Sequence, residues 1–249
     1  EKIKEKISSK TNLISIMHAN NEIGVIQPIQ TIGEICNNNN IIFHVDGAQS
    51  LGKININVKK MKIDLLSLSS HKIYGPKGIG CLYVNKKKLK QLRPITWGGN
   101  QERELRPGTL AVPLIIGFGE ACKISRKIIL NESKNIFKLR SLLIKQIKAA
   151  IPNTIINGDE KQRIPGNINL SFPSLKGQSI INSMPMIAVS GGSACTSSSP
   201  KPSHVLKSIG LNNTLINSSI RICIGRFNTI QDINIAAEII IKTVKQKSS

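Results

Sequence analysis

The stretch Ser67-Leu-Ser-Ser-His-Lys-Ile-Tyr-Gly-Pro-Lys-Gly-Ile-Gly80 decides how the rest of the chain is interpreted. Asp64–Ser69 is a short apolar run, which predicts a buried strand. Repeated turn formers then predict a loop: Gly75, Pro76, Gly78 and Gly80. Lys72 stands at the end of this strand beside His71 and small hydroxyl residues, a setting that can lower the pKa of an amine. Lys72 is therefore a candidate Schiff-base lysine, although an isolated Ser-His-Lys is also typical of surface loops.

Composition sets the class of protein. The chain has 249 residues, of which 40% are hydrophobic and only 3% aromatic, so we expect a core of aliphatic side chains. Its formal net charge of +21 is compatible with a nucleic-acid or acidic membrane surface. However, the lysines are scattered and no aromatic residues lie between them to stack on bases. We therefore expect a lysine-rich surface of compositional origin, and no specific nucleic-acid or membrane partner.

Cysteine usage indicates the compartment. The chain holds five cysteines, an odd number, and no pair has the spacing of a metal site: Cys36, Cys81, Cys122, Cys195 and Cys223. Disulfide scaffolding and a metal centre are therefore not expected. We expect a reducing compartment, the cytoplasm. No signal peptide and no run long enough to span a bilayer is visible. The first residue is Glu1 and not Met, so we expect a fragment or a processed chain.

Short apolar runs alternate with helical patterns in the first part of the chain. Strands are predicted at 13–17, 41–45, 64–69 and 79–84, and a helix at 28–37. This alternation predicts an α/β fold with a largely parallel sheet. Ligands of such sheets bind at the carboxyl ends of the strands. Polar clusters follow three of these strands: Asn20 with Asn21, Asp46 with Gln49, and Ser69 with His71 and Lys72.

The second part of the chain has a different pattern. Residues 96–109 are polar and glycine-rich around Trp97 and predict a functional loop. Helical periodicity covers 112–150, as one helix or two joined ones. Strands are then predicted near 154–157, 167–172, 187–190 and 219–224, and helices at 204–209 and 230–246. The expected organisation is a large α/β domain in residues 1–115, connecting helices in 116–150, and a smaller α+β domain in 151–249.

The three polar clusters fit a cofactor with an aldehyde group. Pyridoxal phosphate needs a lysine that bonds to its aldehyde and a carboxylate that keeps its ring nitrogen protonated. Its phosphate needs hydroxyl and backbone N–H donors. Lys72, Asp46 and Ser69 are residues of these kinds at predicted strand ends.

Cys195 is the candidate nucleophile because it stands in a small, polar Gly/Ser loop, Gly191-Gly-Ser-Ala-Cys-Thr-Ser-Ser-Ser199. The other four cysteines lie in apolar runs and are expected in the core. Arg221 interrupts a strand-like run, where it could clamp a substrate carboxylate or equally face solvent. His44 and His204 belong to no clear constellation and are expected to be structural or exposed.

Taken together, these motifs resemble the cysteine desulfurases of the NifS/IscS type, in the class V branch of fold-type I pyridoxal-phosphate enzymes. The matching stretches follow the family's order over nearly the whole chain: Met17–Gly24, His44–Ser50, Ser70–Gly80, Gln101–Arg103, Arg106–Thr109, Ser190–Thr196 and Ser219–Arg226. The resemblance implies that residues 1–115 are part of the pyridoxal-phosphate domain. It also implies an N-terminal truncation, because the family's phosphate loop and ring-stacking histidine lie upstream of Glu1.

The resemblance also implies a role for each site residue. Lys72 bonds to the cofactor and Asp46 pairs with its ring nitrogen, while Gln49 and Asn21 contact the phenolic oxygen. Ser69 and His71 hold the phosphate, and Thr109 reaches the phosphate in the partner subunit of a homodimer. Arg221 binds the carboxylate of L-cysteine, and Cys195 receives its sulfur as a persulfide.

The activity implied is conversion of L-cysteine to L-alanine, with sulfur passed to an Fe–S scaffold or to another acceptor such as the tRNA thiolation machinery. A transient contact of Cys195 with a [2Fe-2S] cluster belongs to the same expectation. Three alternatives remain open from the sequence. They are a selenocysteine lyase-like class V enzyme, a truncated non-catalytic remnant that binds the scaffold, and a basic nucleic-acid binder.

Overall fold

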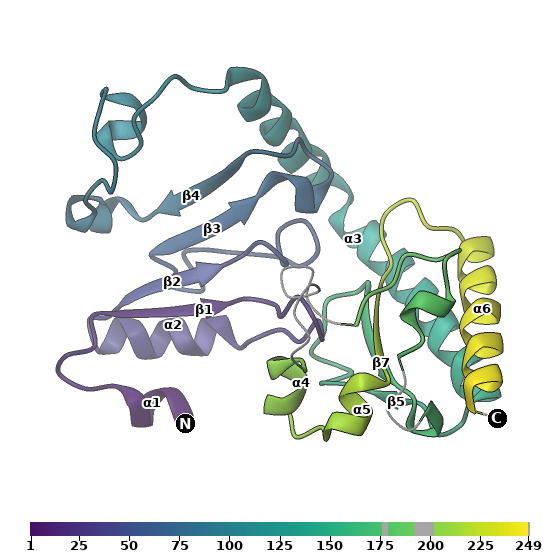
Figure 1. Ribbon diagram of the computed structural model, residues 1–249. Helices are drawn as coiled ribbons and strands as arrows, with labels where there is room; N and C mark the ends of the chain where they lie inside the picture. The colour runs from purple at the N-terminus through teal and green to yellow at the C-terminus, as the bar shows by residue number, and fades with distance from the viewer. Residues whose placement is uncertain (176–178, 192–201, 249) are drawn as a thin grey trace. The chain divides into compact units, whose positions relative to one another are not determined.

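The computed structural model describes residues 1–175, 179–191 and 202–248, and the chain forms two compact units (Figure 1). Unit 1 comprises Glu1–His18 and Gln27–Ile129. Unit 2 comprises Ala19–Ile26 and Leu130–Ser249. Each unit has its own sheet and its own core. The domain limits expected from the sequence, 1–115, 116–150 and 151–249, stay a prediction.

Unit 1 is built on a four-stranded sheet in the order β1-β2-β3-β4. Its strands are β1 (Leu13–Met17), β2 (Ile42–Asp46), β3 (Leu65–Ser69) and β4 (Gly80–Val84). The first three strands are parallel neighbours, and β4 pairs antiparallel with β3. This confirms the mostly parallel α/β sheet. The sequence did not predict the reversed β4, which follows because a loop of about ten residues is too short for a parallel crossover.

Unit 1 also contains two short helices and three 3₁₀ turns. They are α1 (Lys2–Lys6), α2 (Ile29–Asn38) and the 3₁₀ turns η1 (Ser70–Ile73), η2 (Lys86–Gln91) and η3 (Gln101–Glu104). The long helix α3 (Val112–Ala150) is one continuous helix that begins in unit 1 and ends in unit 2.

One face of the unit 1 sheet is covered. Phe43 and Val45 of β2 are fully buried, and they pack with Ile29 and Ile32 of α2. Phe118 and Ala121 in the first half of α3 form a second cluster with Ile73, Leu68 and Ile79. This second cluster lies beneath the η1 turn and anchors the segment that carries Lys72.

The opposite face, which we call the open face, is exposed. Leu13 and Met17 of β1 are 53% and 43% exposed, and Leu82 of β4 is 49% exposed. Because alternate residues of a strand point to the same face, His44 and Asp46 of β2 belong to this face as well. The open face therefore mixes apolar and polar side chains.

Unit 2 has an antiparallel three-stranded sheet in the order β5-β6-β7. Its elements are β5 (Ile155–Ile156), β6 (Asn167–Ser171), η4 (Pro173–Leu175), η5 (Ile181–Ser183), α4 (His204–Ser208), α5 (Asn213–Asn217), β7 (Ser219–Cys223) and α6 (Ile230–Ser248). The core joins β6 and β7 to α6 and to the second half of α3, with Leu143, Ile168 and Ile240 fully buried. Arg226 and Glu132 form a bidentate ion pair at 2.9 and 3.2 Å.

The strand expected near 187–190 is wrong, since only Ser190 makes a bridge, to Arg221 of β7. In the part of the chain that the structure describes, no helix combines the length and the apolar character needed to cross a bilayer.

Two helical glycines of unit 1 provide a matched test of the packing. A methyl group on Gly33 of α2 would overlap the carbonyl oxygen of Met61, whereas one on Gly119 of α3 meets nothing within 4 Å. We expect Gly33→Ala to lower the free energy of unfolding by about 1–2 kcal/mol, because the overlap outweighs the gain in helix propensity. Gly119→Ala should raise it by about 0.5–1 kcal/mol. Urea denaturation checks both, and equal effects would contradict the close approach of α2 to Met61.

Candidate active site

Asp46 is the last residue of β2, and the backbone holds it from both neighbouring strands. The N–H of His18, just after β1, donates to the carbonyl of Asp46 at 2.8 Å. The N–H of Gly47 donates to the carbonyl of Ser67 on β3 at 2.9 Å. The Oδ1 atom of Asp46 accepts from the N–H of Ala48 at 2.9 Å, which starts the turn that follows. The Asp46 side chain is exposed, so its carboxylate is fixed at the strand end and remains accessible.

Lys72 lies in the η1 turn directly after β3. The turn is closed by hydrogen bonds from Ser70 N–H to the carbonyl of Ile79 and from Gly75 N–H to the carbonyl of Ser70. Gly75 packs against Ser70 so closely that any side chain would overlap the Ser70 hydroxyl. Ser70 and Ile73 are buried and point into the core, while His71 and Lys72 are exposed. The loop predicted from glycine and proline is thus a rigid turn that presents a lysine.

Several predicted site residues lie on unit 1 with Lys72. Ser69 ends β3 and Asp46 ends β2, and because β2 and β3 are parallel neighbours both lie at the same edge of the sheet. Gln49 follows in the turn after β2, where its side chain accepts from Lys53 at 3.3 Å. Thr109 is exposed in the loop before α3. The structure therefore brings Asp46, Ser69 and the Lys72 turn to one edge, as the sequence predicted.

Asn21 and Arg221 belong to unit 2. Residues 19–26 form a tight loop closed by Asn20, whose Oδ1 accepts from the N–H groups of Glu22 and Ile23 at 2.8 and 2.9 Å. The carbonyl of Asn21 accepts from Arg221 Nη1 at 3.2 Å and from Asn167 Nδ2 at 3.4 Å. Arg221 is therefore not a free solvent-facing residue, and one hydrogen bond links the two predicted residues.

Buried amide side chains hold this loop, and the sequence prediction missed them. Asn169 of β6 is fully buried and donates to the carbonyl of Glu22 at 3.5 Å. Asn157 in turn donates to Asn169 at 2.6 Å and to Ser171 at 2.8 Å. The signal was available in the pattern Asn167-Ile-Asn-Leu-Ser171, where polar residues alternate within a strand that is buried on both faces.

Cys195 lies outside the described residues, so its position stays a prediction. The described chain before it ends at Gly191, and Ser190 is bonded to β7 through its N–H, which donates to the Arg221 carbonyl at 3.2 Å. The segment that leads to Cys195 therefore starts beside Arg221.

Of the other cysteines, Cys36 is buried as expected, and burial together with Asp64 raises the pKa of its thiol to about 11. The core assignment is wrong for Cys81 and Cys223, which are exposed at a sheet edge and a strand end.

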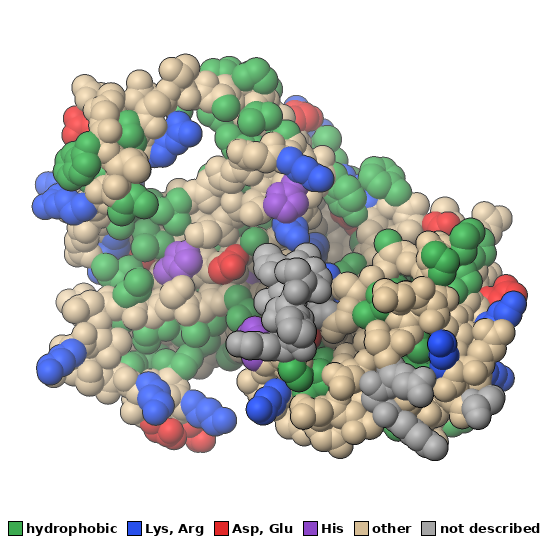
Figure 2. All heavy atoms as spheres, viewed as in Figure 1, with side chains coloured by type: hydrophobic (Ala, Val, Ile, Leu, Met, Phe, Trp, Pro, Cys, Tyr) green, Lys and Arg blue, Asp and Glu red, His purple; other side chains and the backbone are tan. Residues whose placement is uncertain are grey.

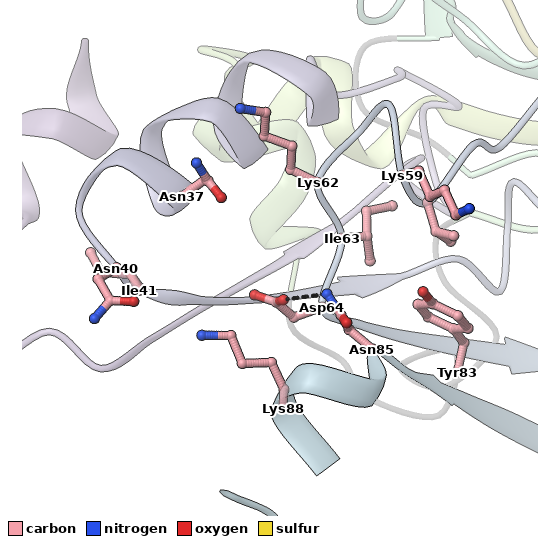
Figure 3. A pocket seen from close by; sticks show the side chains of 11 residues that line it. Asn37, Asn40, Ile41, Lys59, Lys62, Ile63, Asp64, Tyr83, Asn85 and Lys88 are labelled. Carbon is pink, nitrogen blue, oxygen red and sulfur yellow. Dashed lines mark hydrogen bonds between the residues drawn. The ribbon is translucent and has the colours of Figure 1, made fainter. Parts of the chain in front are cut away.

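A pocket of about 320 Å³ lies at the other end of the unit 1 strands (Figure 3). Its lining includes Lys62, Lys88 and Asp64. The Asp64 carboxylate accepts a hydrogen bond from the Asn85 amide at 3.2 Å. This pocket is separated from Lys72 by the length of the strands. On the visible face in Figure 2, Lys and Arg side chains occur in separate small groups.

Comparisons of the sequence and of the structure with known proteins agree on one protein family. Residues 1–235 match the family described as "Aminotransferase class-V". A protein of Ehrlichia chaffeensis named cysteine desulfurase IscS is 51% identical over 247 residues, which are 99% of this chain and 60% of that protein. A protein of Saccharomyces cerevisiae named cysteine desulfurase, mitochondrial, is 47% identical over 98% of this chain and 49% of that protein. The solved structure of a NifS-like protein matches with a TM-score of 0.85 and 30% identity, covering 98% of this chain and 64% of that one. The chain thus spans about 60% of the Ehrlichia chaffeensis protein and about half of the yeast one.

His18, another residue that the sequence analysis did not single out, offers a test by pH. It is 3% exposed, its Nδ1 has no partner among the described residues, and burial lowers its pKa below 6.5. Below that pH the unfolded chain binds a proton that the folded chain resists, so stability is lost as the pH falls. We expect the free energy of unfolding to fall through this residue as the pH drops below about 6.5, because protonation of the buried ring is disfavoured in the folded chain. Denaturation of His18→Gln should show a flatter pH dependence, and the exposed control His204→Gln should not.

Proposed function

Because the chain belongs to the class-V aminotransferase family, we propose that its protein is a cysteine desulfurase that uses pyridoxal 5'-phosphate. The observation that carries this proposal is the edge of the unit 1 sheet, where Asp46, Ser69 and the Lys72 turn meet. The names of its relatives support the reaction type.

The residues at this edge fit the cofactor in chemical kind. An exposed lysine amine on a rigid turn can bond to an aldehyde, and an exposed carboxylate on the adjoining strand end can pair with a cationic ring nitrogen. The hydroxyl of Ser69 and the ring of His71 provide hydrogen-bond donors for a phosphate. Pyridoxal phosphate, when bound, supplies an electron sink for the bonds around the α-carbon of an amino acid.

Each site residue has a proposed role. Lys72 Nζ binds the cofactor and, when released from it, holds a proton close to the substrate. Asp46 fixes the ring nitrogen, Gln49 and Asn21 orient the ring oxygen, and Ser69 with His71 binds the phosphate. Arg221 binds the substrate carboxylate, and its guanidinium is oriented for this by the Asn21 carbonyl.

Cys195 is proposed as the sulfur acceptor. In the net reaction, the bond between the β-carbon and the sulfur of L-cysteine breaks and an S–S bond forms on Cys195. The β-carbon takes up hydrogen, so the products are L-alanine and a persulfide, with no external oxidant or reductant. The proposal is supported by the hydrogen bonds of Ser190 to Arg221, because Ser190 precedes Cys195 closely in the sequence.

The partners proposed for the whole protein follow from a persulfide product. A sulfur acceptor such as an Fe–S scaffold must receive the sulfur, with a transient [2Fe-2S] contact through Cys195 as part of the same proposal. We place this chemistry in the cytoplasm, although relatives named mitochondrial show that the family also works elsewhere. Either compartment must keep the thiol of Cys195 reduced.

A homodimer is proposed as the working form. Support comes from apolar side chains that cluster in one stretch of unit 1 and are exposed: Ile95, Trp97, Leu110, Val112, Ile115 and Ile116. Ile95 is 95% and Trp97 is 83% exposed, values that are unusual for side chains of this size in a monomer. Thr109 lies in the same stretch, which suits its proposed contact with the cofactor phosphate of the partner subunit.

Two substitutions in the complete protein test the activity. Lys72→Ala should abolish the visible absorbance of bound pyridoxal phosphate, because the covalent link is lost. Cys195→Ser should keep that absorbance and abolish persulfide formation from L-cysteine. The matched control Lys77→Ala, in the same loop, should change neither by more than about twofold.

Other outcomes select the alternatives. Turnover of selenocysteine without turnover of cysteine indicates a lyase of that kind. Scaffold capture without a cofactor band indicates a non-catalytic binding protein. Salt-sensitive DNA binding without a cofactor band indicates a nucleic-acid binder.

The dimer is tested with two isoleucines on exposed helix positions. Ile116 in α3 is 66% exposed and Ile235 in α6 is 56% exposed. Ile116→Glu should weaken dimerisation by about tenfold or more, because it places a charge within the apolar stretch. Ile235→Glu should leave the sedimentation of the dimer unchanged, and a monomeric parent protein would contradict the proposal.

A further inference from the structure

Asn167 of β6 and Arg221 of β7 donate to the same carbonyl oxygen. The oxygen of Asn21 lies 3.4 Å from the Nδ2 atom of Asn167 and 3.2 Å from the Nη1 atom of Arg221. A carbonyl oxygen has two lone pairs, so it can accept both hydrogen bonds at once. The two side chains therefore meet at the Asn21 peptide.

Strand register brings these side chains to one face of the unit 2 sheet. In the antiparallel ladder of β6 and β7, Asn169 is paired with Arg221 and Asn167 is paired with Cys223. Paired residues, and residues two apart on one strand, point to the same face. Asn167 is thus a diagonal neighbour of Arg221, at a separation that long side chains can span.

Backbone hydrogen bonds fix the start of the Arg221 side chain but not its end. The N–H and the carbonyl of Arg221 are both bonded to Ser190. Within the described residues, the guanidinium makes one hydrogen bond, to Asn21, so its Nε and Nη2 atoms can still bind a planar carboxylate. The direction in which these two atoms point depends on where the Asn21 carbonyl is held.

Close packing fixes Asn167 against the loop of residues 19–26. Gly24 has a φ of +72°, and a Cβ atom on it would lie 2.7 Å from Asn167 Oδ1 and 2.8 Å from Asn167 Cβ. Only glycine allows the loop and the amide to lie this close in that conformation. The position of the amide is therefore set by packing against the loop, and its N–H group reaches the Asn21 carbonyl from there.

The same amide carries a cost to stability. Asn167 is 3% exposed, and its Oδ1 atom is buried without a hydrogen-bond partner among the residues that the structure describes. An unpartnered buried acceptor lowers the stability of the folded chain. Folding alone therefore does not account for an amide at this position, whereas its bond to Asn21 does.

We propose that Asn167 is a positioning residue, which holds the Asn21 carbonyl and through it orients the Arg221 guanidinium toward the substrate carboxylate. The inference rests on the proposed function for the role of Arg221. The shared acceptor itself does not depend on that function.

The positioning role is tested by steady-state kinetics of the complete protein. Asn167→Ala should raise KM for L-cysteine about fivefold, because a binding group loses its orientation. It should leave kcat and the cofactor absorbance within about twofold of the parent values. Asn234→Ala is the matched control, since this amide of α6 bonds to Gln146 instead, and it should leave KM unchanged. An unchanged KM in Asn167→Ala, or a fall in kcat without a rise in KM, would overturn the role.

A substrate analogue gives a readout that a purely structural role would not move. L-Cysteinamide lacks the carboxylate, so its binding does not need the Arg221 guanidinium. Asn167→Ala should weaken the binding of L-cysteine about fivefold more than that of L-cysteinamide, as followed by the change in cofactor absorbance. Equal weakening of both ligands would overturn the proposal.

A double-mutant cycle tests the shared acceptor without reference to activity. In urea denaturation of the complete protein without cofactor, each single variant, Asn167→Ala or Arg221→Ala, leaves one donor on the Asn21 carbonyl. The double variant leaves none, so it should be less stable than the sum of the two single changes predicts. Additive changes would overturn the shared acceptor. A parent protein that binds no pyridoxal phosphate would refute the proposed function instead, and this cycle would still decide on the shared acceptor.

Discussion

Parallel pairing of β1, β2 and β3 is the constraint on which the candidate site depends. Parallel strands end at the same edge, so backbone pairing alone brings together residues that are far apart in the sequence. The ladder continues past the strands, through the His18 N–H on Asp46 and the Gly47 N–H on Ser67. These bonds fix the backbone at the end of β2, and the Ala48 N–H holds the Asp46 carboxylate. The site is therefore set by backbone bonding before any cofactor is considered.

In unit 2, side chains hold the loop of residues 19–26 in place. The loop of residues 19–26 makes isolated β-bridges within itself and to Arg163, and its remaining backbone groups need side-chain donors and acceptors. Asn167, Asn169 and Arg221 supply amide and guanidinium donors to the carbonyls of Asn21 and Glu22. The amide nitrogens of Asn167 and Asn169 and the guanidinium of Arg221 each donate to a carbonyl here, which offsets the cost of removing these donors from water. The hydrogen bond from Arg221 to the Asn21 carbonyl therefore both holds the loop and fixes the orientation of the guanidinium.

Sequence patterns predicted the local elements well and the long-range pairings poorly. Apolar runs gave β1, β2 and β3 within one residue, and the glycines and proline after Ser69 gave the loop of Lys72. They did not reveal that Asn21 lies in unit 2, because proximity along the chain to β1 implies nothing about packing. The hydrogen bonds of His44 to Ser15 and Ser67 could not be predicted either, since they depend on strand register. Cys223 looked like a core residue because the apolar run of β7 gives no sign of where the strand becomes exposed.

The placement of residues 19–26 in unit 2 has a consequence for how the chain must be made. This loop is synthesised before its partner Arg221, which lies 200 residues further along the chain. Contacts of such long sequence separation form slowly, because a large loop must close first. During synthesis the carbonyl of Asn21 therefore has no Arg221 partner until the segment that contains β7 has been made. Interleaving of this kind also prevents either unit from being moved to another protein as a contiguous cassette.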